Sequence, residues 1–140
     1  MGKVGVPRVL GELIEDRVKR NGDKIFLRFK DHNFSYEEIN RFSNRCAHAF
    51  QNLGIMKGDK VSIMLPNCPE FLYIWFGLAK IGAVEVPVNT SYKGEFLRHI
   101  VDQSDSKVLV IAEEFLDRLR LIEEVCRLTR KVGSGPRYNP

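Results

Sequence analysis

Cysteine is scarce in this chain of 140 residues, which has only Cys46, Cys68 and Cys126. The number is odd, the spacings are wide, and no pair shows the Cys-x-x-Cys spacing of a metal or redox motif. A disulfide framework and a zinc site are therefore both disfavoured. This use of cysteine fits a reducing compartment, and we expect the chain to be cytoplasmic.

Long hydrophobic runs and a strong charge excess are missing as well. The first ten residues, MGKVGVPRVL, contain no apolar run long enough for a signal peptide, and no later window approaches a membrane span. The 22 Lys and Arg residues exceed the 18 Asp and Glu residues by only four and are spread evenly. We therefore expect no transmembrane segment and no nucleic-acid partner.

The densest hydrophobic pattern lies in residues 54–89 and predicts a strand, a helix and a second strand. Residues 60–65 form an apolar run bounded by turn residues, which is typical of a strand. Pro69 begins a segment with large apolar residues on nearly all sides, which predicts a helix covered by protein. Residues 83–88 follow as the second strand, and Pro87 is expected at its end because it has no N–H for a ladder.

The sequence on both sides of this unit predicts further helices and strands. The clearest amphipathic helix begins after Ser35, where Ser35 and Glu38 have the spacing of a capping box, and it ends at Gly54. The other expected elements are a helix over 7–20, a hairpin over 24–34, a helix over 93–104, a strand buried on both faces over 107–111 and a helix over 113–128.

The alternation of strands and helices predicts an α/β fold, specifically a partial layered domain. We expect about three parallel strands with flanking helices, plus an N-terminal helix and a small hairpin. Residues 1–128 form this partial subdomain, and residues 129–140, which are polar and turn-prone, form a disordered tail. Because so small a sheet has two open edges, we expect exposed apolar surface that packs on further polypeptide or self-associates.

Four sequence blocks then occur in a characteristic order and together carry a family resemblance. They are FSYEEI at 34–39, GIMKGDKV at 54–61, LPNCPEF at 65–71 and LAKIGAVEVPVN at 78–89. Over about residues 9–128 the chain resembles the opening of an AMP-forming acyl-CoA synthetase of the adenylate-forming ligase superfamily. KGEFLRHIVDQS at 93–104 is similar to the helix that follows in fatty-acid and carnitine-type ligases.

The resemblance implies a two-step reaction for the full-length enzyme. A fatty or other carboxylic acid attacks ATP to give an acyl-adenylate and pyrophosphate, and the CoA thiol then displaces AMP to give the thioester. The implied cofactors are ATP, Mg²⁺ and CoA. The family's phosphate loop, a Ser/Thr/Gly-rich run ending in Pro-Lys-Gly, is absent: residues 133–136 are too short and lack the lysine. We expect an N-terminal portion that is inactive alone and binds none of these cofactors, and we assign no catalytic, cofactor-binding or metal-binding residue.

Most of the chemically active side chains are expected to have surface or core roles. Contacts to CoA phosphates are the functional alternative for Lys57, Lys60 and Lys93, but solvated lysines are the favoured interpretation. The histidines, which lack metal-ligand spacing and a paired carboxylate, are expected at the surface. They are His32, His48 and His99.

The cysteines and the aromatic residues of the central helix raise similar choices. Cys46 and Cys126 lie on apolar stripes and are expected in the core, whereas Cys68 sits at a helix start that can lower a thiol pKa. Trp75 and its phenylalanine neighbours could line an acyl tunnel, but core packing is favoured. The strand-to-helix turn at 92–95 is the best place for a ligand contact, because α/β sheets bind ligands at the carboxyl ends of strands.

Two further functional classes stay open, so whether the chain is itself an enzyme is undecided. One is a non-catalytic α/β module that docks on a partner chain through its open sheet edge. The other is a small flavodoxin-like ligand-binding domain. Release of pyrophosphate, a defined complex with another chain and binding of FMN, respectively, would distinguish the three hypotheses.

Overall fold

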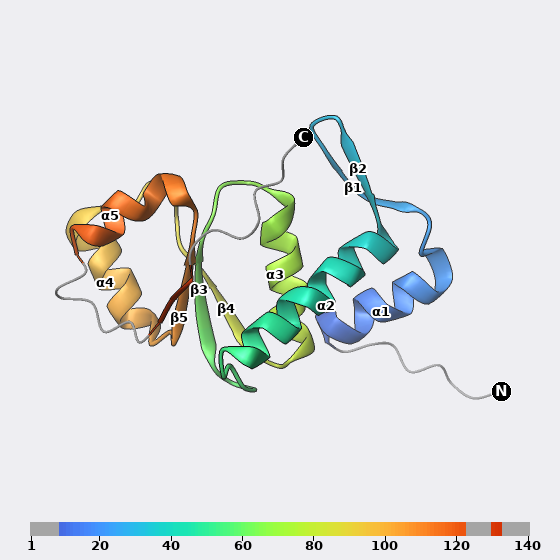
Figure 1. Cartoon of the computed structure of the whole chain (residues 1–140), viewed down its shortest axis with the longest axis horizontal. Helices are drawn as coiled ribbons and strands as arrows, with labels where there is room; N and C mark the ends of the chain where they lie inside the picture. Colours follow the sequence, from blue (N-terminus) through green and yellow to red (C-terminus); the bar gives the residue numbers. More distant parts are fainter. Residues whose placement is uncertain (1–8, 123–129, 133–140) are drawn as a thin grey trace.

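The computed structural model of the protein describes residues 9–122 and 130–132 (Figure 1). Strands and helices alternate along the chain, as expected for the α/β class. In order the elements are α1 (Leu10–Asn21), β1 (Ile25–Phe29), β2 (His32–Ser35), α2 (Tyr36–Asn52), β3 (Lys60–Met64), α3 (Pro69–Lys80), β4 (Val84–Pro87), α4 (Gly94–Ser104), β5 (Val108–Ile111), the 3₁₀ turn η1 (Glu113–Phe115), α5 (Leu116–Arg120) and β6 (Arg130–Val132).

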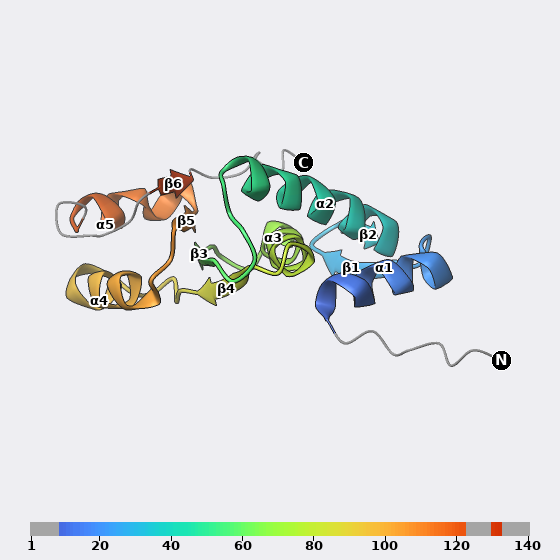
Figure 2. The same ribbon diagram turned by 90° about the horizontal axis from the view of Figure 1, so that it is seen from below.

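The main sheet is parallel throughout and has the strand order β4-β3-β5-β6. The first of these strands along the chain, β3, is therefore central, and its two neighbours come later. Helices cover both faces: α2 and α3 lie on one side of the sheet, and α4 and α5 lie on the other (Figure 2). The antiparallel pair of β1 and β2 forms a separate hairpin, so the expected parallel sheet with an added hairpin is confirmed.

The last part of the chain differs from the expectation in one respect. The segment at 130–132, which the sequence places in a disordered tail, pairs with β5 as the fourth strand β6. Its short polar sequence shows no apolar run, and the strand depends on the open edge that β5 offers. The helix expected over 113–128 is present as η1 and α5 up to Arg120, whereas its residues 123–129 and the remaining tail residues 133–140 lie outside the described residues.

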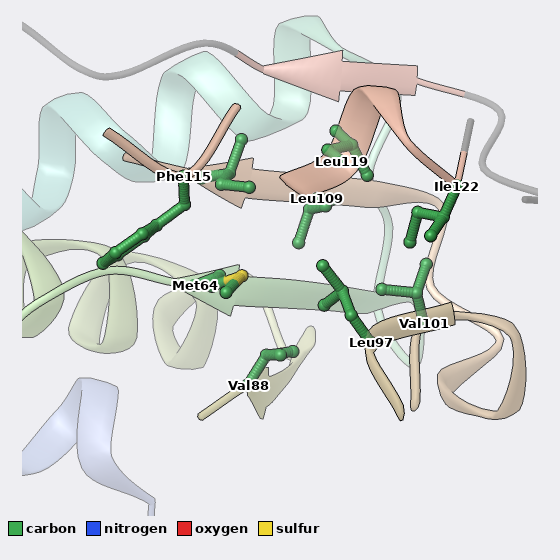
Figure 3. Close-up of a cluster of buried hydrophobic side chains, with 9 residues drawn as sticks. Met64, Val88, Leu97, Val101, Leu109, Phe115, Leu119 and Ile122 are labelled. Atoms are coloured by element: carbon green, nitrogen blue, oxygen red, sulfur yellow. The ribbon is translucent and has the colours of Figure 1, made fainter. Parts of the chain in front are cut away.

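Side chains alternate between the two faces of the central strands, which gives each helical layer its own core. Val61 and Ile63 of β3 pack toward α2 and α3, together with side chains of the same strand face in β5. Met64 points to the other face, where it meets Leu97 of α4 and Leu109 of β5 (Figure 3). Strands buried on both faces are the expected pattern between two layers of helices.

Helix α2 begins as the sequence predicts, and it packs closely on α3. The Ser35 hydroxyl accepts a hydrogen bond from the Glu38 amide at 3.2 Å, and the Glu38 carboxylate accepts one from the Ser35 amide at 2.9 Å, which completes the capping box. At the crossing with α3, a methyl group on Gly77 would lie 2.8 Å from the Ser43 carbonyl oxygen. The two helix backbones can approach this closely because Gly77 has no side chain.

Strand β4 forms one edge of the sheet, and Pro87 is its last residue, as expected. The Val84 amide donates a hydrogen bond to the carbonyl of Asp59, just before β3, and the Val88 amide donates one to the carbonyl of Ile63 in β3. In a parallel strand alternate residues direct their backbone groups to opposite sides, so those of Glu85 and Pro87 point away from β3. Since proline has no N–H, Glu85 supplies the outward-facing donor of this strand. The edge is therefore a poor template for pairing with another chain.

Among the residues that the structure describes, no helix has the length and hydrophobicity needed to cross a bilayer.

Candidate functional site

The carboxyl end of the parallel sheet is the place where this architecture brings loops from different strands together. The chain leaves β3 for α3 on one face, but it leaves β4 and β5 for α4 and α5 on the other face. The connections of β3 and β5 thus diverge where these two strands end. In α/β sheets, ligands characteristically bind at the place where two such connections diverge.

The loop between β4 and α4 is held in place by local hydrogen bonds and by a residue from α5. The Asn89 side chain accepts a hydrogen bond from the Ser91 amide at 2.8 Å. Arg118 donates to the Thr90 carbonyl, and its guanidinium lies 4.7 Å from the centre of the Phe115 ring. The loop is therefore fixed by a contact from α5, as a preorganised binding loop needs to be.

The turn at 92–95 lies at this carboxyl end, where the sequence places the best ligand contact. Tyr92 is half-buried and packs against the core beneath α4, while Lys93 is exposed. Glu95 pairs with Arg98 one helical turn away, and the hydrogen bond from that guanidinium lowers the pKa of the Glu95 carboxyl. The charged ends of this turn thus face solvent, and a ligand role for the turn stays a prediction.

The loop between β3 and α3 borders a mostly apolar hollow of about 240 Å³. Its lining residues are Leu27, Phe29, Asn67, Cys68, Phe71 and Leu72. Cys68 is the N-cap residue of α3 and makes no side-chain capping bond. Burial raises the pKa of its thiol to about 11, which is opposite to the lowering that a helix start can produce. Desolvation of the thiolate outweighs the helix start, and Cys68 is a poor nucleophile.

The three lysines considered as phosphate contacts do not come together. Lys60 begins β3 at the amino end of the sheet and pairs with Asp105 at 3.6 Å. Lys57 packs its side chain on Gly82 near the same end, because a methyl group on that glycine would lie 2.9 Å from the Lys57 Cγ. Lys93 lies beyond the opposite end of the strands. The described residues therefore do not offer the cluster of cations and amides that a triphosphate requires.

The histidines and cysteines show no arrangement typical of a catalytic site. His48 and His99 are exposed, as expected, whereas His32 is half-buried in β2. Cys46 is half-buried between two core clusters, and burial raises the pKa of its thiol to about 11. Cys126 lies outside the described residues. Within residues 9–122 and 130–132, no three His, Cys, Asp or Glu side chains gather as metal ligands do.

Trp75 departs from the sequence-based expectation of core packing, because 40% of its surface is exposed. The neighbouring Phe76 is buried in the core formed with α1 and the hairpin. Helical periodicity showed that α3 is apolar on most sides, but it could not show that one side lacks a covering element. Trp75 is therefore surface rather than core in the described part of the chain.

Glu85 is a residue of interest that the sequence analysis did not single out. Both of its carboxylate oxygens are shielded from solvent, and neither has a hydrogen-bond partner in the structure. Burial raises the pKa of this carboxyl to about 7. The available signal was the acidic residue within the apolar strand Val-Glu-Val-Pro, since a charge in such a strand needs either solvent or a partner.

Comparison with known proteins gives consistent matches over most of the chain. A family model described as "AMP-binding enzyme" matches residues 14–136. The crotonobetaine/carnitine–CoA ligase of Salmonella paratyphi A is 41% identical over 120 residues, which is 82% of this chain and 23% of that protein. The chain thus spans about a quarter of the length of the curated relatives that it matches.

Solved structures show the same fold. An inhibitor-bound N-terminal domain of FACL13 from Mycobacterium tuberculosis is 28% identical, with a TM-score of 0.84 over 91% of this chain and 34% of that one. The anthranilate CoA ligase AuaEII, in complex with anthranoyl-AMP, is 23% identical with a TM-score of 0.85; the match covers 95% of this chain and 26% of that one. At this level of identity the second match supports the fold alone.

Proposed function

The chain belongs to the family of AMP-binding enzymes, and from this membership we propose that it forms the N-terminal α/β layer of an AMP-forming acyl-CoA ligase. The resemblance to these synthetases over about residues 9–128 is confirmed at the level of the family. The observation that carries the proposal is the 41% identity to a CoA ligase over 120 residues. The parallel sheet with helices on both faces and the match to FACL13 agree with it.

In such a ligase the substrate would be a fatty or other carboxylic acid, and ATP, Mg²⁺ and CoA would be the cofactors. The acid would be converted to an acyl-adenylate and then to a thioester, which places the activity in fatty-acid or related acid metabolism in the cytoplasm. The described residues do not fit the nucleotide by themselves. The loop before α3 has no Ser/Thr/Gly-rich run and no lysine, and its first helical residue, Pro69, has no N–H to offer a phosphate.

The role that the described residues support is therefore structural within the ligase. Strand β3 and its neighbours set the spacing of the loops at the carboxyl edge, and Arg118 fixes the loop after β4. We propose that the 140-residue chain alone is inactive, because it has no Ser/Thr/Gly-rich loop ending in lysine. Turnover then requires the parts of a ligase that bind ATP.

A chimeric enzyme tests this proposal. The matched 120-residue segment of the Salmonella ligase is replaced by the corresponding segment of this chain, and pyrophosphate release from ATP is measured with carnitine or crotonobetaine and CoA. We expect the chimera to retain turnover and the 140-residue chain alone to have none. The matched control carries Leu97→Asp in the grafted segment, because Leu97 is fully buried and a carboxylate there disrupts the core.

Two outcomes would contradict the proposal. A chimera that is folded and monodisperse but releases no pyrophosphate would show that this segment cannot act as the scaffold of a CoA ligase. Turnover by the 140-residue chain alone would contradict its inactivity.

The second candidate function is a non-catalytic module that docks on a partner chain or on itself. The exposed aromatic side chains of Trp75 and Phe96 favour it. Two results together would support this alternative. The 140-residue chain would form a stable complex with a partner, and turnover of the chimera would not depend on the grafted segment.

A further inference from the structure

Glu85 is an acidic residue on the core side of its strand. In the parallel register of β4 with β3, Glu85 stands beside Val61, so the two side chains project from the same face of the sheet. Val61 is fully buried and belongs to the core beneath α2 and α3. Both oxygens of the Glu85 carboxyl are shielded from solvent, and neither has a hydrogen-bond partner. This environment suits a neutral group better than an anion.

The elements packed against β4 are β3 and α3, and their cations are already engaged. Lys60 of β3 stands beside Val84, which places it on the opposite face of the sheet from Glu85. Lys80, in the last turn of α3, donates to the carboxylate of Glu15 in α1 at 2.6 Å. Neither lysine is therefore available to balance a negative charge at Glu85.

The other titratable groups on these elements and on the turn before β3 are also accounted for. In α3, Glu70 lies in the first turn, and Tyr73 belongs to the core shared with α1 and the hairpin. In the turn, Asp59 pairs with Lys107 at 2.7 Å, and Lys57 is exposed. The carboxyl of the edge strand is thus surrounded by apolar groups rather than by charges.

The proton on Glu85 is consequently coupled to folding. Burial alone raises the pKa of Glu85 from 4.5 to about 7. Between these two values the folded chain binds more protons than the unfolded chain. The free energy of unfolding therefore falls as the pH rises through this window, and it levels off above pH 7.

Strand β4 is placed so that its movement disturbs little else. It is the end strand in the order β4-β3-β5-β6, and among the described strands it pairs with β3 alone. Its carboxyl end leads into the loop that the Asn89 side chain and Arg118 hold. A weaker pairing of β4 with β3 would loosen this loop and leave the ladder between β3 and β5 intact.

We propose that Glu85 is a pH-sensitive switch: the folded chain holds it as the neutral acid, and its ionisation loosens β4 and the loop that follows. The anion has neither solvent nor a donor in its place, and it regains solvent when the edge strand moves away from the sheet. The proposal is independent of the ligase function, because it concerns packing within the described residues.

Titration of Glu85 tests whether the folded chain holds the proton. The 140-residue chain is labelled uniformly with ¹³C and ¹⁵N, and the Glu85 carboxyl carbon is assigned through its own side chain and followed by NMR as a function of pH. We expect a midpoint of about 7. A midpoint in the ordinary range of glutamate, about 4–5, would overturn the proposal.

Urea denaturation at pH 5 and pH 8 tests the coupling to stability. Between these values the unfolding equilibrium constant of the unaltered chain should rise at least about tenfold more than that of Glu85→Gln, which cannot ionise. The matched control is Glu37→Gln, which removes an exposed carboxylate from α2 and should keep the pH dependence of the unaltered chain. If Glu85→Gln keeps that dependence as well, the proposal is overturned.

Hydrogen exchange at pH 8 tests whether the edge strand is what loosens. The Val84 and Val88 amides, which donate toward β3, should exchange at least about tenfold faster in the unaltered chain than in Glu85→Gln. The Ala112 amide, which donates to the Met64 carbonyl from the β5 side, should change by a smaller factor. An equal change at all three amides would show a uniform loss of stability and would overturn the switch.

Discussion

Replacing Gly77 with alanine tests how tightly α2 and α3 are packed. Gly77 faces the backbone of α2: a Cβ atom there would lie 2.8 Å from the Ser43 oxygen, 2.9 Å from the Cys46 Cβ and 3.1 Å from the Ala47 nitrogen. Ordinary contacts begin at 3.4 Å, so the helices must separate by about 0.6 Å. A gap of this size forfeits roughly a quarter to a half of the dispersion energy of each contact it opens.

Two opposing effects decide the size of the change. Alanine favours a helix over glycine by about 1 kcal/mol, whereas overpacking a well-filled interface costs roughly 1–3 kcal/mol. Because all three close atoms belong to the backbone or to a Cβ, no flexible side chain can yield, and we take the upper end of the range. The net expectation is a loss of about 2 kcal/mol in the free energy of unfolding.

Urea denaturation followed by circular dichroism measures this loss. Ala49→Gly, on the exposed side of α2, calibrates helix propensity alone and should cost about 1 kcal/mol. Adding Cys46→Ala to the Gly77→Ala variant should not restore stability, because the Cβ that is in the way remains. If Gly77→Ala is instead more stable by the amount that helix propensity gives, the close approach of the two helices is not as described.

Three further predictions concern local features. Ser35→Ala removes the cap of α2 and should lower the free energy of unfolding by about 1 kcal/mol in the same assay; an unchanged value would mean that the capping box adds nothing. Burial raises the thiol pKa of Cys46 and Cys68 to about 11, so at pH 8 both should react with iodoacetamide about a hundredfold more slowly in the folded chain than in urea. The rate in the folded chain should rise roughly tenfold per pH unit until the pH reaches about 11. Peptide mass spectrometry measures these rates, and equal rates with and without urea would contradict the prediction. Arg118→Ala should lower the free energy of unfolding by about 1–2 kcal/mol and speed hydrogen exchange in residues 89–93, and Arg118→Lys should have an intermediate effect. Exchange that speeds up equally throughout the sheet would show that Arg118 does not act locally on this loop.

The parts of the fold that were predictable from sequence are those set by local or strongly periodic signals. The capping box at Ser35 depends on residues three apart, and β5 is one continuous apolar run. Pro87 marks the end of a strand because it cannot donate a hydrogen bond. The strand β6 was missed because it results from the free edge of β5 rather than from an apolar pattern of its own.

The site was less predictable because its properties come from what surrounds each residue. A helix start favours a low thiol pKa at Cys68, but burial dominates, and burial is not visible in sequence. Lys57 and Lys93 lie at opposite ends of the sheet because of strand direction, which spacing alone does not give. Trp75 is exposed on an otherwise apolar helix and the Glu85 carboxylate is buried without a partner, and neither environment can be read from the periodicity of the sequence.

The central position of β3 has a consequence for how the protein emerges from the ribosome. Both neighbours of this strand are translated after it, and the second, β5, ends 47 residues beyond Met64. At roughly 5–20 residues per second, translation leaves β3 without one of its partners for several seconds. During that interval its apolar side chains are available to chaperones, and slow codons between residues 64 and 111 would extend the exposure.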